Sequence, residues 1–120
     1  MRQIKAGSGW RLGWNPEAQQ FCGLVAGEHW AFELTEPELN DFCRLTLQLA
    51  ATLQQMAGEL MAQERITCEA ESELIWLEVE GYPQSYSLRF ILLLGRGAEG
   101  FWPAIATAEV IRAIPGLRLF

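Results

Sequence analysis

Residues 29–53 read HWAFELTEPELNDFCRLTLQLAATL, and inside this stretch a strand pattern gives way to a helix pattern. From residue 29 to 34, apolar residues alternate with more polar ones, which is typical of a strand with one buried face. Thr35 then stands three residues before Glu38, the spacing of a capping box at the start of a helix. Apolar residues recur every three or four positions after that, so the sequence predicts one long amphipathic helix that reaches about residue 63.

Short strands are predicted on both sides of this helix. Runs rich in aromatic and aliphatic residues, separated by Gly, Asn and Pro, precede it at residues 9–14, 21–26 and 29–34. Period-two alternation returns after it, at residues 66–94. Two turns, at 72–73 and at 81–84, are expected to divide that region into three strands.

A second, shorter helix is predicted after these strands. A glycine-rich loop at 95–100 leads to an apolar run at about 104–114, which Pro115 and Gly116 bring to an end. A chain of 120 residues suits one domain, residues 1–120. We therefore expect an α+β fold, with antiparallel sheets in strands-helix-strands-helix order and helices against their apolar faces.

The charge and the cysteine content disfavour several classes of protein. The formal net charge is −6, from 15 acidic against 9 basic residues, so long-range repulsion disfavours nucleic acid and anionic membranes as partners. The three cysteines, Cys22, Cys43 and Cys68, are widely spaced and lack a Cys-x-x-Cys pair, which favours buried thiols over a metal site. Neither a signal-peptide pattern nor a run of about 18 apolar residues occurs, so we expect a cytoplasmic protein without a membrane span.

No catalytic motif stands out in the sequence. The one histidine, His29, lies between acidic residues and could act as a general base, but a surface role without catalysis is the favoured interpretation. The loop at 95–100 could present backbone amides to an anion at a helix N-terminus, although a flexible turn is favoured because the loop lacks a P-loop pattern. Four tryptophans are expected to pack in or near the core: Trp10, Trp14, Trp30 and Trp102.

Two neighbouring predicted strands carry glutamates at alternate positions: Glu69, Glu71, Glu78 and Glu80. These carboxylates could gather around a hard cation such as Ca²⁺ or Mg²⁺, but such sites usually draw their ligands from loops rich in Asp and Asn. A solvated charged face is therefore favoured. We predict no catalytic residue, no metal and no cofactor, and the balance favours a protein that is not an enzyme.

A candidate partner-binding face centres on Trp76, which the alternation places on the polar side of its strand. If residues 81–84 form a four-residue hairpin loop, Trp76 lies opposite Arg89 and can make a cation–π contact, with Glu78 within diagonal reach. An apolar centre inside an acidic border suits a basic protein partner. The face comprises Leu74, Trp76, Glu78, Arg89 and Ile91. The alternative is that the N-terminal strands or a second subunit cover Trp76.

A second candidate surface lies on the long helix, beside the stripe that is expected to meet the sheet. It is formed by Leu45, Leu49, Thr52 and Met56. A second apolar line of this kind predicts a homodimer that associates through the helix. The alternative is a monomer in which other parts of the chain cover the line.

Several motifs rich in Trp and Gly occur in order along nearly the whole chain: GSGWRLGW (7–14), WAFELT (30–35), ELM (59–61), IWLE (75–78) and EGFWP (99–103). Together they resemble a cyanobacterial family of unknown function, domain-of-unknown-function family 1818. The resemblance implies a fold similar to the Whirly-type single-stranded DNA-binding transcriptional regulators, which associate through their helices. It implies no activity and no site residue.

Two hypotheses for the function follow from the residues and the resemblance together. Whirly proteins carry a lysine-rich Lys-Gly-Lys-Ala-Ala-Leu motif for DNA, whereas this chain contains only Lys5. The leading hypothesis is therefore a non-enzymatic, homodimeric protein-interaction module of Whirly-like fold. The alternative is a single-stranded nucleic-acid-binding transcriptional regulator, which the acidic charge and the missing motif disfavour. In that case the first cations to mutate would be Arg2, Lys5 and Arg11.

Overall fold

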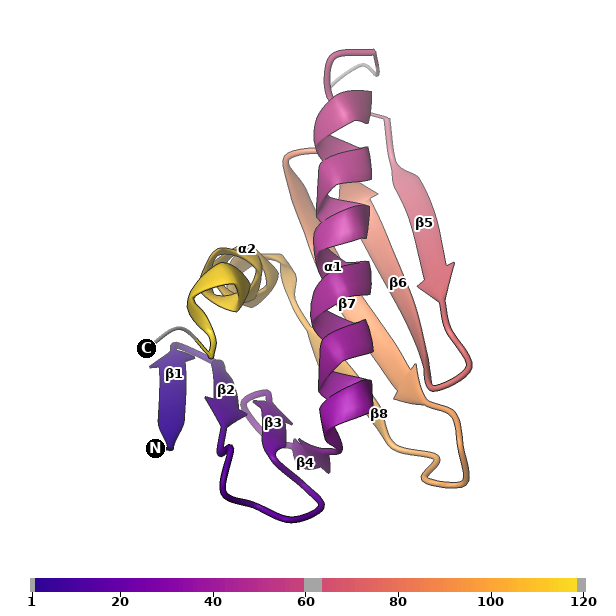
Figure 1. The fold of residues 1–120 in the computed structure, drawn as a ribbon. Coiled ribbons are helices and arrows are strands. Elements are labelled where there is room, and N and C mark those ends of the chain that lie inside the picture. Colours follow the sequence, from indigo (N-terminus) through magenta and orange to yellow (C-terminus); the bar gives the residue numbers. More distant parts are fainter. Residues whose placement is uncertain (1, 60–63, 119–120) are drawn as a thin grey trace.

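The computed structural model describes residues 2–59 and 64–118, and it contains two four-stranded antiparallel sheets (Figure 1). The first sheet runs in chain order through β1 (Gln3–Gly7), β2 (Trp10–Trp14), β3 (Gly23–Ala26) and β4 (Ala31–Leu34). The helix α1 (Glu36–Met56) follows. The second sheet runs through β5 (Ile66–Glu71), β6 (Ile75–Tyr82), β7 (Ser85–Leu92) and β8 (Glu99–Trp102). A second helix, α2 (Ala104–Ala113), and a 3₁₀ turn (Ile114–Gly116) come last.

The predicted α+β class and the strands-helix-strands-helix order are confirmed, but each sheet has one strand more than expected. β1 and β8 were missed because QIKAG and EGFW contain few β-branched residues, and pairing with β2 and β7 holds them in place. The long helix ends at Met56 rather than near residue 63, since Gly58 follows closely and glycine disfavours helix. Residues 60–63 lie outside the described part. Within residues 2–59 and 64–118, no helix has both the length and the apolar character needed to cross a membrane.

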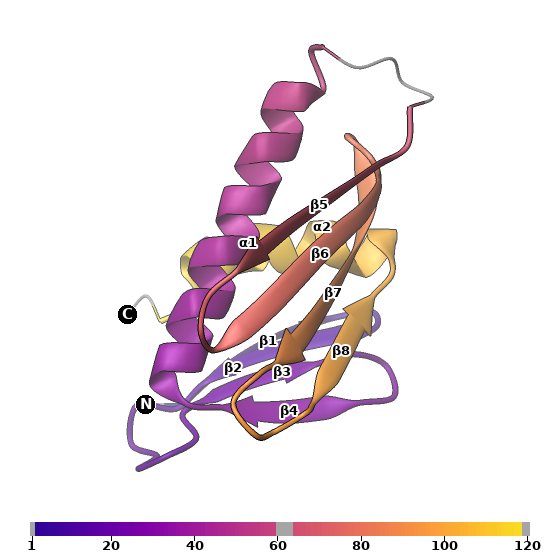
Figure 2. The same ribbon diagram turned by 90° about the vertical axis from the view of Figure 1, so that its right-hand side faces the viewer.

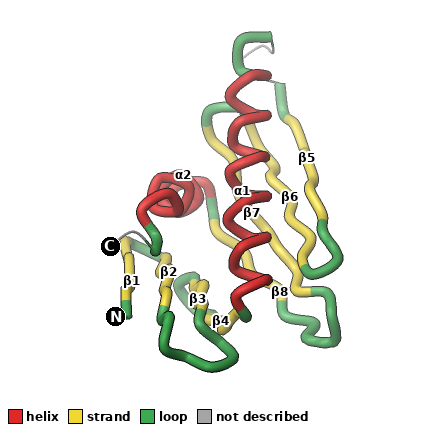
Figure 3. Tube along the Cα trace, viewed as in Figure 1, coloured by secondary structure: helices red, strands yellow, loops and turns green. Residues whose placement is uncertain are grey.

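α1 begins at the predicted capping box. The Thr35 hydroxyl accepts a hydrogen bond from the Glu38 amide at 3.3 Å, and the Thr35 amide donates to Glu38 Oε1 at 2.9 Å. The buried Glu38 carboxylate also binds Arg96 Nη1 at 2.7 Å, while Arg96 donates to the Glu33 carbonyl and lies over the ring of Phe21 at 4.9 Å. These contacts tie the β2–β3 and β7–β8 loops, drawn in green in Figure 3, to the N-terminus of α1.

α1 covers one face of the second sheet, where it packs on β5 and β6 (Figures 1 and 2). It contributes Leu39, Phe42 and Leu53 to the core, and each of these side chains is fully buried. The inward rows of β6 and β7 are buried as well: Ile75, Leu77, Val79, Leu88, Phe90 and Leu92. Because successive strand residues point to opposite faces, the intervening residues of these strands lie on the other, outward face.

A cluster of aromatic rings joins the two sheets. Trp102 of β8 is fully buried, and its ring centroid lies 5.6 Å from that of Phe90 and 5.2 Å from that of Trp30. The Trp102 indole nitrogen donates a hydrogen bond to the carbonyl of Ala26 in β3 at 2.9 Å. Gly100 leaves room for these rings, because a Cβ there would lie 2.5 Å from Phe90 and 2.7 Å from Trp30. The two sheets are therefore connected by a hydrogen bond enclosed by aromatic rings.

The Trp102 hydrogen bond predicts a large loss of stability when its donor is removed. Trp102→Phe removes the fully buried indole N–H and its hydrogen bond to the Ala26 carbonyl, which costs about 0.5–1.5 kcal/mol, and it also leaves a void. Trp30→Phe removes a similar bond, to the Phe101 carbonyl at 3.1 Å, but at an exposed position where water can replace the donor. In urea denaturation, we expect Trp102→Phe to lose about 1 kcal/mol more than Trp30→Phe. Equal losses would contradict the proposed role of the bond.

Candidate protein-binding face

The outward side of the second sheet carries most of the residues that the sequence singled out. Leu77 and Val79 of β6 are buried, so Trp76 and Glu78 point to the opposite side. The register of the four strands aligns two rows of side chains on that side: Glu69, Glu78, Arg89 and Phe101 in one, and Glu71, Trp76, Ile91 and Glu99 in the other. We term these two rows the acidic face.

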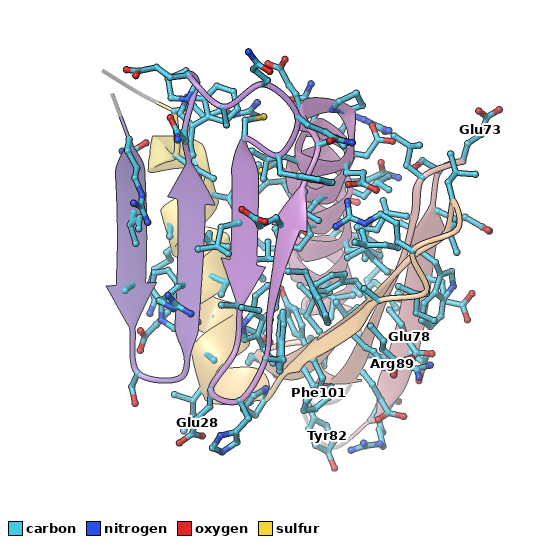
Figure 4. The ribbon with its side chains drawn as sticks, turned by 90° about the horizontal axis from the view of Figure 1, so that it is seen from below. Glu28, Glu73, Glu78, Tyr82, Arg89 and Phe101 are labelled. Atoms are coloured by element: carbon cyan, nitrogen blue, oxygen red, sulfur yellow. The ribbon has the colours of Figure 1, made fainter. Side chains whose placement is uncertain are left out.

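A stacked pair of Trp76 and Arg89 stands at the centre of the acidic face. The guanidinium carbon of Arg89 lies 4.9 Å from the centroid of the Trp76 ring. Arg89 Nη2 is 3.6 Å from Glu78 Oε1, and Nη1 is 3.4 Å from Glu99 Oε2. The Trp76 indole nitrogen donates to Glu69 Oε1 at 3.2 Å. Carboxylates thus hold both members of the stack, and Figure 4 shows Glu78 beside Arg89 on this side of the sheet.

The hairpin between β6 and β7 sets the register of this pair, and it differs from the expected one. Its loop consists of Pro83 and Gln84, rather than the four residues that were predicted. Trp76 therefore lies opposite Ile91, and Glu78 lies opposite Arg89. The predicted alignment of Trp76 with Arg89 is wrong, but the predicted cation–π contact is present on the diagonal. A shift by an even number of residues keeps every side chain on the expected face.

Trp76 and Ile91 are half-buried, and Phe101 is 48% exposed. Leu74 is half-buried too and lies in the turn before β6, at the end of the acidic face. Trp76 is not part of the core, so within the described chain the N-terminal strands do not bury it. Phe101 and Glu99 were missed because β8 was not predicted, and the short alternation in EGFW was the only signal for them.

The glutamates considered as a cation site lie on this outward side, but arginines accompany them. Arg65 Nη2 is 3.1 Å from Glu80 Oε1, and Arg89 pairs with Glu78. Among the described residues, no group of three or more His, Cys, Asp or Glu side chains is arranged to hold a metal ion. Carboxylates outnumber arginines on this side of the sheet, so the field there attracts cationic groups.

The apolar line predicted on the long helix is not free in the structure. Leu45 and Leu49 are only 3% and 4% exposed and belong to the chain's own core. Thr52 is exposed and donates its hydroxyl to the Gln48 carbonyl at 3.0 Å, and Met56 is half-buried against the core. The expectation that the two leucines present a surface for a second copy is therefore wrong. As in the alternative, other parts of the chain itself cover these two leucines.

In the described part of the chain, no catalytic or anion-binding site is formed around the other candidates. His29 lies in the turn before β4, which begins at Ala31 rather than at residue 29, and its side chain is 87% exposed. Its Nε2 is 4.0 Å from the carboxylate of Glu28. The glycine-rich loop leads into β8 and not directly into α2, so it does not present its amides at a helix N-terminus.

The sequence predicted three buried thiols, and two of them, Cys22 and Cys43, are buried. Burial raises the pKa of the Cys43 thiol, and the guanidinium of Arg118 opposes this shift. Burial, followed by the carboxylate of Glu36, also raises the pKa of Cys22. A raised pKa lowers the thiolate fraction at neutral pH, and the thiolate is the nucleophilic form. Cys68 is half-buried on β5.

The comparison with protein families agrees with the resemblance to domain-of-unknown-function family 1818. The model of a family described as a domain of unknown function, DUF1818, matches residues 5–117. The chain is also similar to a crystal structure of a protein with unknown function from Prochlorococcus sp. NATL2A, described as a DUF155 family member. That similarity covers 98% of each chain, with 30% sequence identity and a TM-score of 0.92. No curated protein matches the chain.

The half-buried position of Trp76 predicts a modest effect on stability when its ring is removed. We expect Trp76→Ala to lower the free energy of unfolding by about 1–2 kcal/mol, through the lost cation–π contact and partial burial. Phe90→Ala, at a fully buried ring, serves as the reference and should cost about 3–5 kcal/mol. Chemical denaturation of both variants makes the comparison. A loss near 3 kcal/mol for Trp76→Ala would show that the ring is part of the core.

Proposed function

The chain belongs to the DUF1818 family, whose function is unknown, and from its own surface we propose that it is a non-enzymatic protein-interaction module that acts in the cytoplasm. The observation that carries this proposal is the Trp76–Arg89 stack, half-buried and held by the carboxylates of Glu69, Glu78 and Glu99. Tryptophan and arginine are enriched at binding hot spots. A stack that is already ordered loses little side-chain entropy when a partner binds. The free thiols suit a reducing compartment.

The charge of the acidic face supports a basic partner. Glu71 forms no ion pair among the described residues, and the Glu69 carboxylate accepts only the neutral Trp76 indole there. No cation among the described residues therefore pairs with either carboxylate, and both lie on the exposed side of β5. Trp76, Ile91 and the exposed ring of Phe101 add apolar area on the strands beside them. A partner segment that combines lysine or arginine with apolar residues complements both properties.

The distribution of cations argues against the alternative of single-stranded nucleic acid. Four arginines form ion pairs with acidic residues of the chain itself: Arg44, Arg65, Arg89 and Arg96. Lys5 pairs across the first sheet with the fully buried Leu12, whereas Arg11 is exposed on the other side of that sheet. Lys5 and Arg11 therefore lie on opposite faces of the first sheet. A continuous positive track along a phosphate backbone is not formed by these residues.

The Whirly-type architecture remains part of the proposal. It is supported by the repeated order of a four-stranded antiparallel sheet followed by a helix. A shared architecture would not transfer DNA binding, because function depends on the residues of the site and not on the fold.

A basic peptide tests the proposed function directly. The probe is a fluorescent octapeptide of alternating lysine and valine, and fluorescence anisotropy at low and physiological salt measures its affinity. We expect Trp76→Ala to weaken binding about thirtyfold, the effect of losing about 2 kcal/mol at a hot spot. Glu71→Lys should weaken binding, whereas Glu28→Lys makes the same charge change outside the acidic face, away from Glu78 and Arg89 in Figure 4, and should not.

The same titration separates the two hypotheses for the function. A mixed-sequence single-stranded oligonucleotide should bind weakly or not at all at physiological salt. Tight oligonucleotide binding that falls with salt at a slope near −0.7 per neutralised phosphate would favour the nucleic-acid alternative. Equal effects of Glu71→Lys and Glu28→Lys, together with no effect of Trp76→Ala, would contradict the proposal of a binding site on the acidic face.

We also propose that the module is a homodimer, with α2 rather than α1 as the contact surface. Ile105 of α2 is 79% exposed. It borders a groove of about 520 Å³ between α2 and the β6–β7 hairpin, lined among others by Pro83, Tyr86, Ala108 and Arg112. A two-fold axis near Ala108 would place Ile105 of each copy in the groove of the other.

The homodimer predicts a mass of twice 13.5 kDa in solution. Light scattering across a concentration series should show this mass for the wild type, while Ile105→Asp shifts the equilibrium to the monomer by burying a charge. Ala51→Asp introduces the same charge on the exposed side of α1 and serves as the matched control. A mass that stays at 13.5 kDa at high concentration would refute the dimer. Equal effects of the two variants would refute α2 as its contact surface.

A further inference from the structure

We propose that β5 is a docking edge, to which an extended basic segment of another protein adds as a new strand of the second sheet. This inference rests on the proposed function, because it names the conformation and the chemistry of the partner that the acidic face binds. An added strand is held by main-chain hydrogen bonds, and the side chains on its two sides supply specificity.

β5 is the longest edge strand in the described part of the chain. It has six residues, against five for β1 and four each for β4 and β8. Within that part its only strand partner is β6, and Figure 2, viewed from the β5 side, shows it outermost in the sheet. An edge strand presents a row of main-chain donors and acceptors that another strand can pair with.

The other edges are less suitable for strand addition. The C-terminal segment contacts β1, since Gln3 Nε2 donates to the Gly116 carbonyl at 3.3 Å and Gln3 Oε1 accepts from the Arg118 amide at 2.7 Å. On β8, the main-chain carbonyl of Phe101 already accepts a hydrogen bond from the Trp30 indole, so it is not free to pair with an added strand. β4 is short. β5 alone among these strands combines length with a free edge in the described residues.

The inward side of β5 leaves apolar surface uncovered. Ile66, Cys68 and Ala70 alternate along this side and are half-buried, although they pack against the core. Their neighbours on β6, Leu77 and Val79, are fully buried. The apolar inward side of the sheet is therefore less well buried at β5 than at β6. Apolar residues at alternate positions of an added strand would bury more of this side.

The outward side of β5 selects a basic partner. Thr67, Glu69 and Glu71 are exposed there, and Glu78 lies in the next strand opposite Glu69. The Cβ atoms of two residues directly opposite each other in paired strands lie about 4.5–5.5 Å apart. A lysine or arginine of the added strand would therefore form ion pairs with these carboxylates. β5 of a second copy would bring glutamate against glutamate, which is destabilising. The occupant is therefore a segment with alternating basic and apolar residues, and not another copy of this strand.

Backbone methylation of the lysine-valine octapeptide tests strand addition without changing the protein. Alternate amides of an extended chain point to opposite edges, so one peptide is N-methylated at every lysine and another at every valine. We expect one of the two to lose binding at least about tenfold and the other to bind like the parent, because only one set of amides faces β5. Amide hydrogen exchange should slow in residues 66–71 when the parent peptide binds.

The outcomes separate this inference from the proposed function. If both methylated peptides bind like the parent while Glu71→Lys still weakens binding more than Glu28→Lys, strand addition is refuted and the acidic face remains a binding surface. If exchange in residues 66–71 does not change on binding, strand addition is likewise refuted. If no form of the peptide binds at any salt concentration, the proposed function falls together with the inference.

Discussion

The indole of Trp102 determines how the two sheets meet. Its hydrogen bond to the Ala26 carbonyl is enclosed by the rings of Phe90 and Trp30, so the sheets cannot move apart without leaving a buried polar group unpaired. The two helices fill the space on the same side of the second sheet, with α1 on β5 and β6 and α2 on β7 and β2. One face of the second sheet is thereby committed to the core. The opposite face is left outside it, and the functional surface follows from this arrangement.

The acidic face combines weak individual contacts with a rigid base. Ion pairs between exposed groups contribute about 0–1 kcal/mol each, so the contacts of Arg89 with Glu78 and Glu99 add little stability. Their larger effect is on orientation, because they hold the guanidinium over the Trp76 ring. The buried rows of β6 and β7 beneath this face hold the backbone in place. A surface that is ordered before binding loses less entropy when a partner docks.

The placement of the arginines explains why the chain has a strongly negative surface on one side. Arg96 forms an ion pair with Glu38 at the N-terminus of α1. Arg118 lies over the ring of Trp14 and donates a hydrogen bond to Asn40. Both therefore serve the fold and not a ligand. The acidic face keeps its excess of carboxylates as a result. Family membership adds no activity to this picture, so the site's chemistry rests on these residues themselves.

The sequence by itself determined the features that depend on neighbouring residues along the chain. The capping box at Thr35, the order of strands and helices and the outward position of Trp76 all follow from local spacing, and each agrees with the structure. The contact between Trp76 and Arg89 was predicted from a register that is wrong, and it is present because both residues still alternate onto the same face. Local patterns were sufficient for these features, since helix caps and strand faces depend on residues only a few positions apart.

Only the tertiary structure decided which surfaces are free and how the strands align. β1 and β8 exist because neighbouring strands pair with them, so Glu99 and Phe101 could not be assigned to the acidic face beforehand. The two-residue hairpin loop changed the register by two positions, a choice that the turn sequence left open. Leu45 is buried by parts of the chain distant in sequence. These features depend on packing and hydrogen bonding between distant segments, which no local spacing of residues records.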